Sequence, residues 1–316
     1  MSNGDVTIMI PTYNQEAYLA QAIESCLMQD YEHLNVVVAD DCSTDGTGSV
    51  ASRYSGKSGI SCHRNTTNIG RVANYANTLS KLVTTEWVVN LDGDDYYTDN
   101  TFISKAMSDI REAGRRGFSV VAHLGNHNLD VAGRHLPGAV VLESGSLCVS
   151  GKTYFREYPR AGQFAHMSCI YRADTARQSG GYDLDSVASD FHALMKVFLH
   201  GDVILGENQP GVWRIHGGNA SQSNLRQKYL SAFSMYEDLA RHAGTFFSTG
   251  ELTRWKAEMR DGAYDDYILT ACSAATGIGS VISLLKDFRF RRVFLDAIRL
   301  LAKRAFRTTA TNSEQA

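Results

Sequence analysis

The chain of 316 residues contains an acidic turn with an Asp-x-Asp motif, Asp92-Gly-Asp94-Asp95, directly after the apolar run 87–91. Carboxylates gathered at the end of a buried strand repel one another, so a bound cation would stabilise them. Carboxylate oxygens suit Mg²⁺ or Mn²⁺, and magnesium is usually held by one or two carboxylates together with substrate phosphates. We therefore predict a divalent metal site here. The alternative is a turn rich in helix-capping aspartates, with Asp99 capping the next helix.

A second acidic pair, Asp40-Asp41, follows the β-branched run 35–39. A carboxylate at a strand end can accept a hydrogen bond from a base N–H or a ribose hydroxyl. The Pro-Thr-Tyr-Asn turn at 11–14 offers backbone groups and an aromatic ring to a planar base. Each segment also has a plain alternative, because one aspartate of the pair could cap the following turn and residues 11–14 could form a simple turn.

The elements that must position these residues can be predicted from the pattern of the first hundred residues. Short apolar runs alternate there with helical patterns, which is typical of βαβ units and a largely parallel sheet. Ligands bind such sheets at the carboxyl ends of the strands, so the polar loops should share one cleft. Residues 118–215 show weaker periodicity and should complete the domain with further strands and loops. We predict strands at 6–10, 35–39, 60–64 and 87–91, and helices at 16–28, 71–82 and 191–199.

Several segments share their order, spacing and strand context with one known family. They are Ile10-Pro-Thr-Tyr-Asn-Gln-Glu, Asp40-Asp-Cys-Ser-Thr-Asp-Gly-Thr, Asn68-x-Gly70 with Asn74, and Leu91-Asp-Gly-Asp-Asp. Further segments are Gly180-Gly-Tyr-Asp183, Ser189-Asp190 and Trp213-Arg-Ile-His216-Gly-Gly-Asn219-x-Ser221. Over residues 5 to 225 the chain resembles the family 2 inverting glycosyltransferases.

The resemblance implies an α/β fold of the GT-A type, a Rossmann-like nucleotide-binding sheet with mixed strands on the acceptor side. It also implies a nucleoside-diphosphate sugar as donor, most often UDP-linked, and inversion at the anomeric carbon. Asp92, Asp94 and His216 would hold Mn²⁺ or Mg²⁺. The donor nucleotide would lie against Pro11, Thr12, Tyr13, Asp40, Asp41, Asn68, Gly70 and Asp92.

The same resemblance makes Asp190 the catalytic base. The acceptor hydroxyl loses its proton as it attacks the sugar, and a positioned carboxylate contributes about 10²–10⁴-fold to such a step. A metal ion would neutralise charge on the departing diphosphate. Judged without the resemblance, Asp190 could simply complement the dipole of the following helix. The family usually has Glu before this Asp, whereas Ser189 stands here, so a role of that carboxylate in acceptor binding does not carry over.

Three further polar residues are candidates for the same site. Arg214 and His216 match the family's Arg-x-His element, and a cation with an imidazole beside a diphosphate would act as a charge clamp or a metal contact. His166 is predicted to contact the acceptor or the diphosphate. The alternative for both histidines is a buried structural role. Segment 251–255 superficially resembles the Gln-x-x-Arg-Trp element of processive family members, but it begins with Glu and lacks flanking membrane helices, so we expect a non-processive enzyme.

Composition limits the other classes of function. Hydrophobic residues make up 43% and charged residues 21%, as in globular proteins, and the net charge of −3 argues against a nucleic-acid binder. Six cysteines show no C-x-x-C pair, so neither a zinc site nor a disulfide scaffold is predicted, and a reducing cytoplasm fits best. We see no secretory signal and no apolar stretch near 18 residues.

We predict a GT-A glycosyltransferase domain at 1–225, a C-terminal helical region at 226–307 and a disordered tail at 308–316. Apolar and basic residues alternate within 281–307 as in an amphipathic helix. This segment could lie on the cytoplasmic face of the inner membrane as a peripheral contact, or could pack on the catalytic domain.

The predicted function is transfer of a hexosyl or N-acetylhexosaminyl group to a glycan or lipid-diphosphate-linked acceptor, in the biosynthesis of a surface polysaccharide. One alternative is a nucleotide-sugar-binding partner or regulator that does not catalyse, and the intact Asp190 counts against it. Another is a nucleotidyltransferase, which would need a Gly-rich phosphate loop with a nearby Lys. The sequence contains no such loop.

Overall fold

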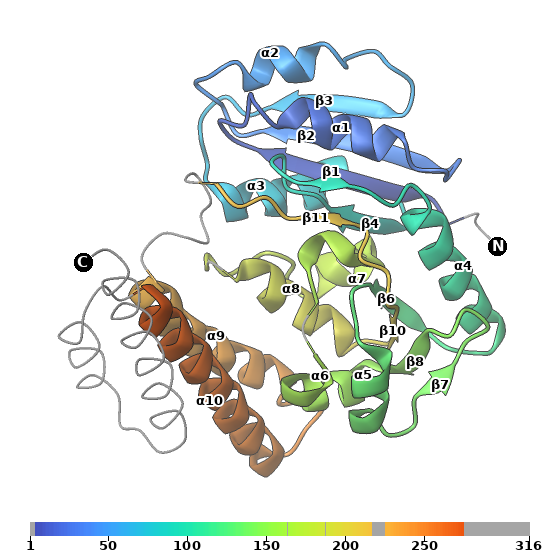
Figure 1. Cartoon of the computed structure of the whole chain (residues 1–316), viewed down its shortest axis with the longest axis vertical. Helices are drawn as coiled ribbons and strands as arrows, with labels where there is room; N and C mark the ends of the chain where they lie inside the picture. Colours follow the sequence, from blue (N-terminus) through green and yellow to red (C-terminus); the bar gives the residue numbers. More distant parts are fainter. Residues whose placement is uncertain (1–3, 163, 187, 217–224, 275–316) are drawn as a thin grey trace, which may run out of the picture.

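The computed structural model describes residues 4–162, 164–186, 188–216 and 225–274 (Figure 1). Its strands are β1 (Val6–Thr12), β2 (Leu34–Asp40), β3 (Ile60–Arg64), β4 (Trp87–Asn90), β5 (Tyr96–Tyr97), β6 (Val120–Leu124), β7 (Val140–Val141), β8 (Leu147–Ser150), β9 (Cys169–Arg172), β10 (Asp202–Leu205) and β11 (Gly211–Val212). Its α-helices are α1 (Leu19–Leu27), α2 (Thr47–Ser52), α3 (Arg71–Asn77), α4 (Phe102–Arg115), α5 (Leu129–His135), α6 (Gly151–Ala161), α7 (Ala173–Gln178), α8 (Ser189–Phe198), α9 (Leu225–Ala243) and α10 (Thr249–Ala274).

A mixed sheet forms the centre of the molecule, with the strand order β3-β2-β1-β4-β9-β6-β10-β8-β7. The strands β3, β2, β1 and β4 are parallel, as the βαβ pattern predicts. Strand β9 then lies antiparallel between β4 and β6, so the sheet becomes mixed on the other side. The predicted α/β class with mixed strands is therefore confirmed. Two short strands, β5 and β11, pair separately and bring the segment after residue 210 to the acidic turn that follows β4.

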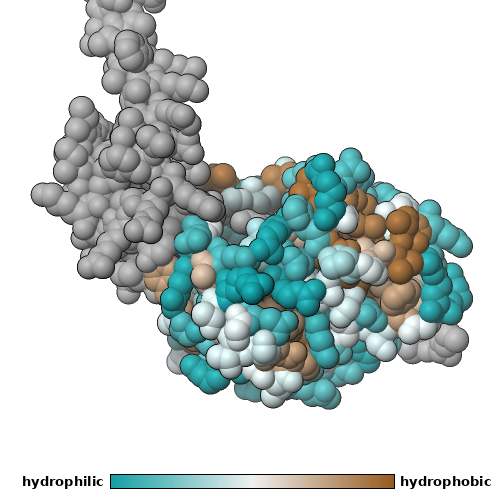
Figure 2. All heavy atoms as spheres, turned by 90° about the horizontal axis from the view of Figure 1, so that it is seen from below, coloured by the Kyte–Doolittle hydropathy of each residue, from teal (hydrophilic) through white to brown (hydrophobic). Residues whose placement is uncertain are grey.

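Alternation along β1 explains how the sheet is covered on both faces. Ile8 and Ile10 point to one core and Met9 to the other, because successive side chains of a strand face opposite sides. Helices α1, α2 and α4 cover the first core, and α3, α6, α7, α8, α9 and α10 contribute to the second, as Figure 1 lets the reader follow. In Figure 2 hydrophilic side chains occupy much of the face seen from below, with hydrophobic ones gathered in smaller patches. No helix within the described ranges is long and apolar enough to cross a membrane.

The predicted elements agree closely with the observed ones, with three main differences. Strand β1 continues to Thr12 and so includes the first two residues of the predicted turn at 11–14. Helix α1 begins at Leu19 rather than at 16, because the Gln15 carbonyl accepts the backbone N–H groups of Tyr18 and Leu19 in a turn. The predicted helix 71–82 consists of α3 followed by a π-helical turn, Thr78–Leu82. Helix α9 begins at Leu225, at the predicted domain boundary, and the division into domains stays a prediction. The predicted amphipathic segment 281–307, the tail 308–316, Asn219 and Ser221 lie outside the described residues.

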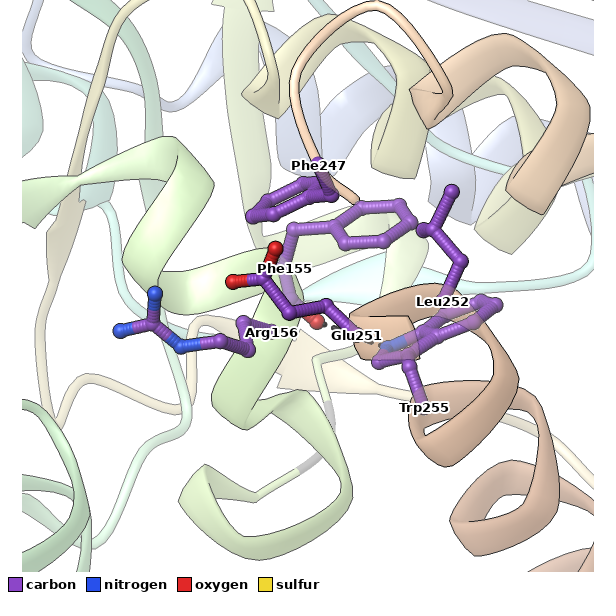
Figure 3. Close-up of a pocket in the computed structure, with 6 residues that line it drawn as sticks. All are labelled: Phe155, Arg156, Phe247, Glu251, Leu252 and Trp255. Carbon is purple, nitrogen blue, oxygen red and sulfur yellow. Dashed lines mark hydrogen bonds between the residues drawn. The ribbon is translucent and has the colours of Figure 1, made fainter. Parts of the chain in front are cut away.

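Helix α10 is attached to α6 through an aromatic cluster (Figure 3). Phe155 stacks between Phe247, at a centroid distance of 5.6 Å, and Trp255, at 4.6 Å. Pro159 lies inside α6 and has no N–H, so it cannot bond to the carbonyl four residues earlier. That carbonyl belongs to Phe155, and Trp255 Nε1 donates to it at 2.9 Å. Trp255 therefore packs in the core and supplies the hydrogen-bond donor that Pro159 cannot supply to helix α6.

Replacing Trp255 with Phe should keep the stacking but leave the Phe155 carbonyl without a donor. A buried polar group without a partner costs about 1–3 kcal/mol, so the free energy of unfolding should fall by that amount. Urea unfolding measures it, with Arg254→Lys on the exposed side of α10 as the control, expected within about 0.5 kcal/mol of the original chain. Equal free energies of unfolding for Trp255→Phe and the control would show that the indole N–H does not stabilise α10.

Candidate active site

The acidic turn after β4 is packed tightly against the end of β1. Gly93 N donates a hydrogen bond to Pro11 O at 3.3 Å. A Cβ atom on Gly93 would lie 2.7 Å from Thr12 Oγ1 and closer still to Gln15 Oε1, so only glycine leaves room for this approach. The middle residue of the Asp-x-Asp motif is thus fixed by packing, and the two carboxylates beside it are held at the end of β1.

Several hydrogen bonds join the loop after β2 to the loop after β1. Asp41 N donates to Thr12 O at 2.9 Å, Asn14 N donates to Ser43 Oγ at 2.9 Å, and Thr44 N donates to Asn14 Oδ1 at 2.8 Å. Asn14 has a φ of +53°, which asparagine adopts more readily than most residues. The loops after β1, β2 and β4 therefore meet at one edge of the sheet.

The carboxylate of Asp41 organises the segment before α3. It is buried, and its Oδ1 accepts hydrogen bonds from Asn65 Nδ2 at 2.8 Å and Ile69 N at 2.9 Å. Its Oδ2 accepts one from Gly70 N at 2.9 Å, and Asn68 Oδ1 lies 3.1 Å from the same N–H. Gly70 has a φ of +90°, which a side chain would oppose. The predicted residues Asp41, Asn68 and Gly70 are thus brought together where the loop after β2 meets the loop before α3.

The neighbouring residues Asp40 and Tyr13 differ strongly in exposure. Asp40 is 1% exposed, and its Oδ1 accepts from Ser43 N at 2.9 Å and Ser43 Oγ at 2.5 Å, while Oδ2 lies 3.5 Å from Arg64 Nη1. Tyr13 is 44% exposed. Asp40 is therefore enclosed by its own loop, whereas the ring of Tyr13 is open to a ligand.

Asp92 is held by two donors on one of its oxygens. Tyr75 Oη donates to Asp92 Oδ1 at 2.6 Å, and Asn90 Nδ2 donates to the same atom at 2.9 Å. No described residue donates a hydrogen bond to the second oxygen, Oδ2. This arrangement fixes the direction of the carboxylate and leaves one oxygen for a ligand.

Arg214 and His216 reach the acidic turn from the segment after β11, because β11 pairs with β5. His216 Nε2 lies 2.9 Å from Asp94 Oδ2, and its ring stacks on Tyr18 at 4.7 Å. Arg214 N donates to Asp95 Oδ1 at 2.9 Å, and Arg214 Nη1 donates to the Asp94 carbonyl at 2.7 Å. The structure thus places both residues of the Arg-x-His element on the acidic turn.

Negative charge is concentrated at this turn beyond what its partners neutralise. Burial raises the pKa of Asp94, and the charge of Asp92 raises it further, against the opposing hydrogen bond from His216. Burial raises the pKa of Asp95 to about 8, with Asp92 and Asp94 adding to the effect and the Arg214 N–H opposing it. A divalent cation would favour the charged forms of these groups. Their oxygen-rich donor set fits Mg²⁺ or Mn²⁺.

Asp190 lies in the first turn of α8, near the acidic turn but on another element. It is partly buried, and no described residue hydrogen-bonds its carboxylate. Burial lowers the pKa of His166, and the charge of Asp190 opposes this shift. Burial also raises the pKa of Tyr182, and the charge of Asp190 adds to that effect. A carboxylate that accepts no hydrogen bond from a described residue is suited to accept a proton from a ligand.

Arg71, the first residue of α3, places a positive charge near both Asp92 and Asp190. Burial works against its charge, but Tyr75 and these two aspartates outweigh it and raise the pKa of Arg71. Its Nη2 donates to the Ser186 carbonyl at 2.7 Å, in the loop before α8. Arg71 thus links the nucleotide side of the sheet to the segment that carries Asp190.

Sequence reasoning missed four residues of this site, namely Arg71, Tyr75, Asn90 and Tyr182. Arg71 and Tyr75 are one helical turn apart and directly follow the Asn68-x-Gly70 turn, so their spacing was a signal that could have been used. Asn90 was also visible, as a polar residue ending the apolar strand β4. His166, which was predicted, lies between Asn90 and Tyr182 with both ring nitrogens in hydrogen-bond contact.

The profile of the family described as Glycosyl transferase family 2 matches residues 7–172, which is more than half of the sequence. The chain belongs to glycosyl transferase family 2. The matched range ends in β9, so it holds the acidic turn, Asp41 and His166, while Asp190 lies beyond it.

Curated relatives of this family 2 chain match it over shorter stretches. The poly(ribitol-phosphate) beta-N-acetylglucosaminyltransferase TarS of Staphylococcus aureus is 33% identical over 112 residues, which is 33% of this chain and 20% of TarS. The uncharacterized glycosyltransferase MG025 of Mycoplasma genitalium is 38% identical over 100 residues, which is 30% of this chain and 33% of that protein. The matched part therefore spans a fifth to a third of these relatives.

Solved structures extend the likeness to most of the family 2 chain. S. aureus TarS 1-349 in complex with UDP-GlcNAc gives a TM-score of 0.62 at 19% identity, over 90% of this chain and 80% of that one. The mannosyltransferase PcManGT from Pyrobaculum calidifontis, in complex with GDP-Man and Mn2+, gives 0.53 at 17% identity, over 89% and 79%. This likeness concerns the fold, and it confirms the predicted GT-A type.

Replacing Asp41 with Asn should loosen the segment 65–70 of the family 2 domain. The Asp41 carboxylate accepts three hydrogen bonds, and an amide NH2 group in place of one oxygen would face at least one of these donors with another donor. The free energy of unfolding should therefore fall by about 1–3 kcal/mol. Scanning calorimetry without ligand measures this effect. The exposed Asp130→Asn in α5 is the control, expected within about 0.5 kcal/mol. If both variants unfold like the original chain, Asp41 does not hold this loop.

Proposed function

We propose that this chain transfers one sugar from a nucleoside-diphosphate sugar, UDP-linked, to a hydroxyl group of a glycan or lipid-diphosphate-linked acceptor, with inversion. The observation that carries the proposal is the placement of Asp190, whose carboxylate accepts no hydrogen bond from a described residue, across Arg71 from Asp92. Family membership supports it. TarS, a relative over a third of this chain, is an N-acetylglucosaminyltransferase and has been solved with UDP-GlcNAc.

The nucleotide is proposed to bind in the loops after β1 and β2. A carboxylate has about four lone-pair sites, and three at Asp41 are occupied, so one remains for the N–H of a uracil base or a ribose hydroxyl. The exposed ring of Tyr13 would stack on the base, with Pro11 and Thr12 beside it. Asp40 accepts two hydrogen bonds from Ser43 of its own loop, which favours a supporting role for it in holding that loop.

The divalent cation, Mn²⁺ or Mg²⁺, is proposed to bind at Asp92, Asp94 and His216. No set of three or more His, Cys, Asp or Glu side chains in the described ranges is arranged to hold a metal by itself. The proposed site therefore depends on the substrate diphosphate, because one or two carboxylates usually share a magnesium ion with substrate phosphates. Bound there, the ion would neutralise charge on the leaving diphosphate.

The chemical step is proposed to rest on Asp190. Its open carboxylate accepts the proton of the acceptor hydroxyl as that oxygen attacks the anomeric carbon, and the bond to the diphosphate breaks on the opposite side. Arg71 and Arg214 supply fixed positive charge around the reacting groups. Because Ser189 stands where the family usually has Glu, the acceptor is bound without that carboxylate.

The cellular setting of the reaction is also a proposal. Synthesis of a surface polysaccharide, such as an O-antigen or capsule, would place the enzyme in the cytoplasm. A peripheral contact of segment 281–307 with the inner membrane would bring it to a lipid-linked acceptor. The basic amphipathic pattern of that segment supports this contact.

Titration calorimetry with UDP, GDP, dTDP and CDP should show binding of UDP that depends on Mn²⁺. Asp94→Ala should weaken UDP binding at least about 10-fold, because it removes a carboxylate that shares the ion with the diphosphate. Asp130→Ala, on the exposed side of α5, is the control and should bind UDP like the original chain. If no nucleotide binds with any metal, the donor site is assigned wrongly.

Asp190→Asn should retain UDP binding but lower kcat by about 10²–10⁴-fold, because the amide cannot accept the proton. Release of UDP from a sugar nucleotide in the presence of acceptor measures the rate. Asp185→Asn, an exposed aspartate in the loop before α8, is the matched control and should keep full activity. Full biological activity of Asp190→Asn would instead favour the non-catalytic binding protein.

A further inference from the structure

His166 lies between the acidic turn and helix α8, which carries the proposed catalytic base Asp190. Its Nδ1 lies 3.2 Å from Asn90 Nδ2, and its Nε2 lies 2.7 Å from Tyr182 Oη. Asn90 also donates to Asp92, and Tyr182 Oη lies 2.8 Å from Tyr171 Oη. A continuous row of hydrogen bonds therefore runs from Asp92 through one imidazole ring to two tyrosines.

The direction of every hydrogen bond in this row is set by the carboxylate. An ionised carboxylate only accepts, so the amide nitrogen of Asn90, and not its oxygen, must face Asp92. The same nitrogen faces His166 Nδ1, which must then be the unprotonated acceptor. The ring hydrogen therefore sits on Nε2 and is donated to Tyr182 Oη, whose own hydrogen goes to Tyr171 Oη.

This orientation of the Asn90 amide has a free-energy cost. It is 1% exposed, and its Oδ1 is a buried atom without a hydrogen-bond partner among the described residues. Such an atom costs about 1–3 kcal/mol, so the amide would turn over if its two nitrogen contacts were worth less. The orientation is thus maintained jointly by Asp92 and His166.

The ring of His166 also influences Asp92 through aromatic packing against Tyr75. The rings of His166 and Tyr75 meet edge to face at 5.8 Å, and Tyr75 donates to the oxygen of Asp92 that Asn90 also contacts. Tyr182 packs on both rings, at 5.2 Å from Tyr75 and 5.8 Å from His166. Both donors that orient Asp92 therefore rest against His166.

The other end of the row is fixed to the helix of the catalytic base. Tyr182 follows the turn at Gly180, whose φ of +98° a side chain would oppose. The next residue, Asp183, accepts a hydrogen bond at 2.6 Å from Lys196 of α8, which is 1% exposed. The position of Tyr182 is therefore tied to α8, which carries Asp190 in its first turn.

We propose that His166 is a positioning residue that, as the neutral Nε2–H tautomer, orients Asp92 for the donor and couples it to α8. The roles of Asp92 and Asp190 in this statement rest on the proposed function. In this role both ring nitrogens of His166 are engaged by Asn90 and Tyr182, and the direct contact with the acceptor or the diphosphate stays a prediction.

Nuclear magnetic resonance of ¹⁵N-histidine-labelled full-length protein tests the coupling without any nucleotide. The signals of His166 among the ten histidines are identified by their loss in His166→Gln. We expect the neutral Nε2–H tautomer in the original chain, and a shift toward the other tautomer in Asp92→Asn, because an amide at position 92 lets Asn90 turn over. A Nδ1–H tautomer, or a His166 signal unchanged by Asp92→Asn, would overturn the proposal.

The kinetics of two variants then distinguish the contribution of the Nδ1 contact with Asn90 from that of the Nε2 contact with Tyr182. The amide of Asn lies at the same distance from the backbone as Nδ1, and the amide of Gln at that of Nε2. His166→Asn should keep the acceptor for Asn90 and hold KM for the sugar nucleotide within about 2-fold, whereas His166→Gln should raise KM about 10-fold. Equal KM values for both variants would refute the orientation of Asp92 by His166.

The two experiments also separate this inference from the proposed function. If the original chain neither binds nor turns over a sugar nucleotide, the proposed function fails. The tautomer of His166 and its response to Asp92→Asn then still decide whether the two residues are coupled. If the chain is active but the response is absent, only the inference about His166 fails.

Discussion

Strand β1 joins the parts of this site through its last two carbonyl groups. Thr12 O accepts the N–H of Asp41, and Pro11 O accepts the N–H of Gly93. Because β1 pairs in parallel with β2 on one side and β4 on the other, both acidic loops begin at the same edge. These two hydrogen bonds draw the loops inward over the end of β1. Glycine at position 93 is needed for that approach.

The close approach of the acidic loops to the end of β1 has an electrostatic cost, because it buries carboxylates. Burying a carboxylate costs several kcal/mol unless a cation or hydrogen bonds compensate, and three carboxylates lie within four residues here. The chain supplies part of the compensation from distant segments, with Arg214 and His216 after β11 and Arg71 at the start of α3. The pKa of Asp95 at about 8 shows that the compensation is incomplete. The proposed divalent ion and diphosphate would complete that compensation.

Much of the nucleotide side could be predicted from the sequence because its signals are local. The β-branched run that forms β2 and the polar residues at the strand ends lie close together along the chain, and strand β3 was predicted at its observed bounds. The relative roles of Asp40 and Asp41 could not be predicted, because they depend on which side chain turns toward segment 65–70. The role of Tyr182 could not be predicted either, although the segment Gly180-Gly-Tyr-Asp183 was recognised. Its contact with His166 forms across 16 residues through the packing of α7 and α8. Pro159 did carry a signal for the attachment of α10, although only the structure shows that Trp255 answers it.

The change from parallel to antiparallel pairing explains why one histidine can connect the two sides of the site. Strand β9 enters the sheet between β4 and β6, so the residues just before it pass the carboxyl end of β4. His166 lies in that short segment and faces Asn90, the last residue of β4. The chain then continues through β9 and α7 to the turn at Gly180, which returns Tyr182 to the same ring. A change in the length of β9 or α7 would move Tyr182, and with it α8, relative to Asp92. The spacing between the two carboxylates is therefore a property of the sheet topology, and the ring of His166 is the contact through which that spacing is maintained.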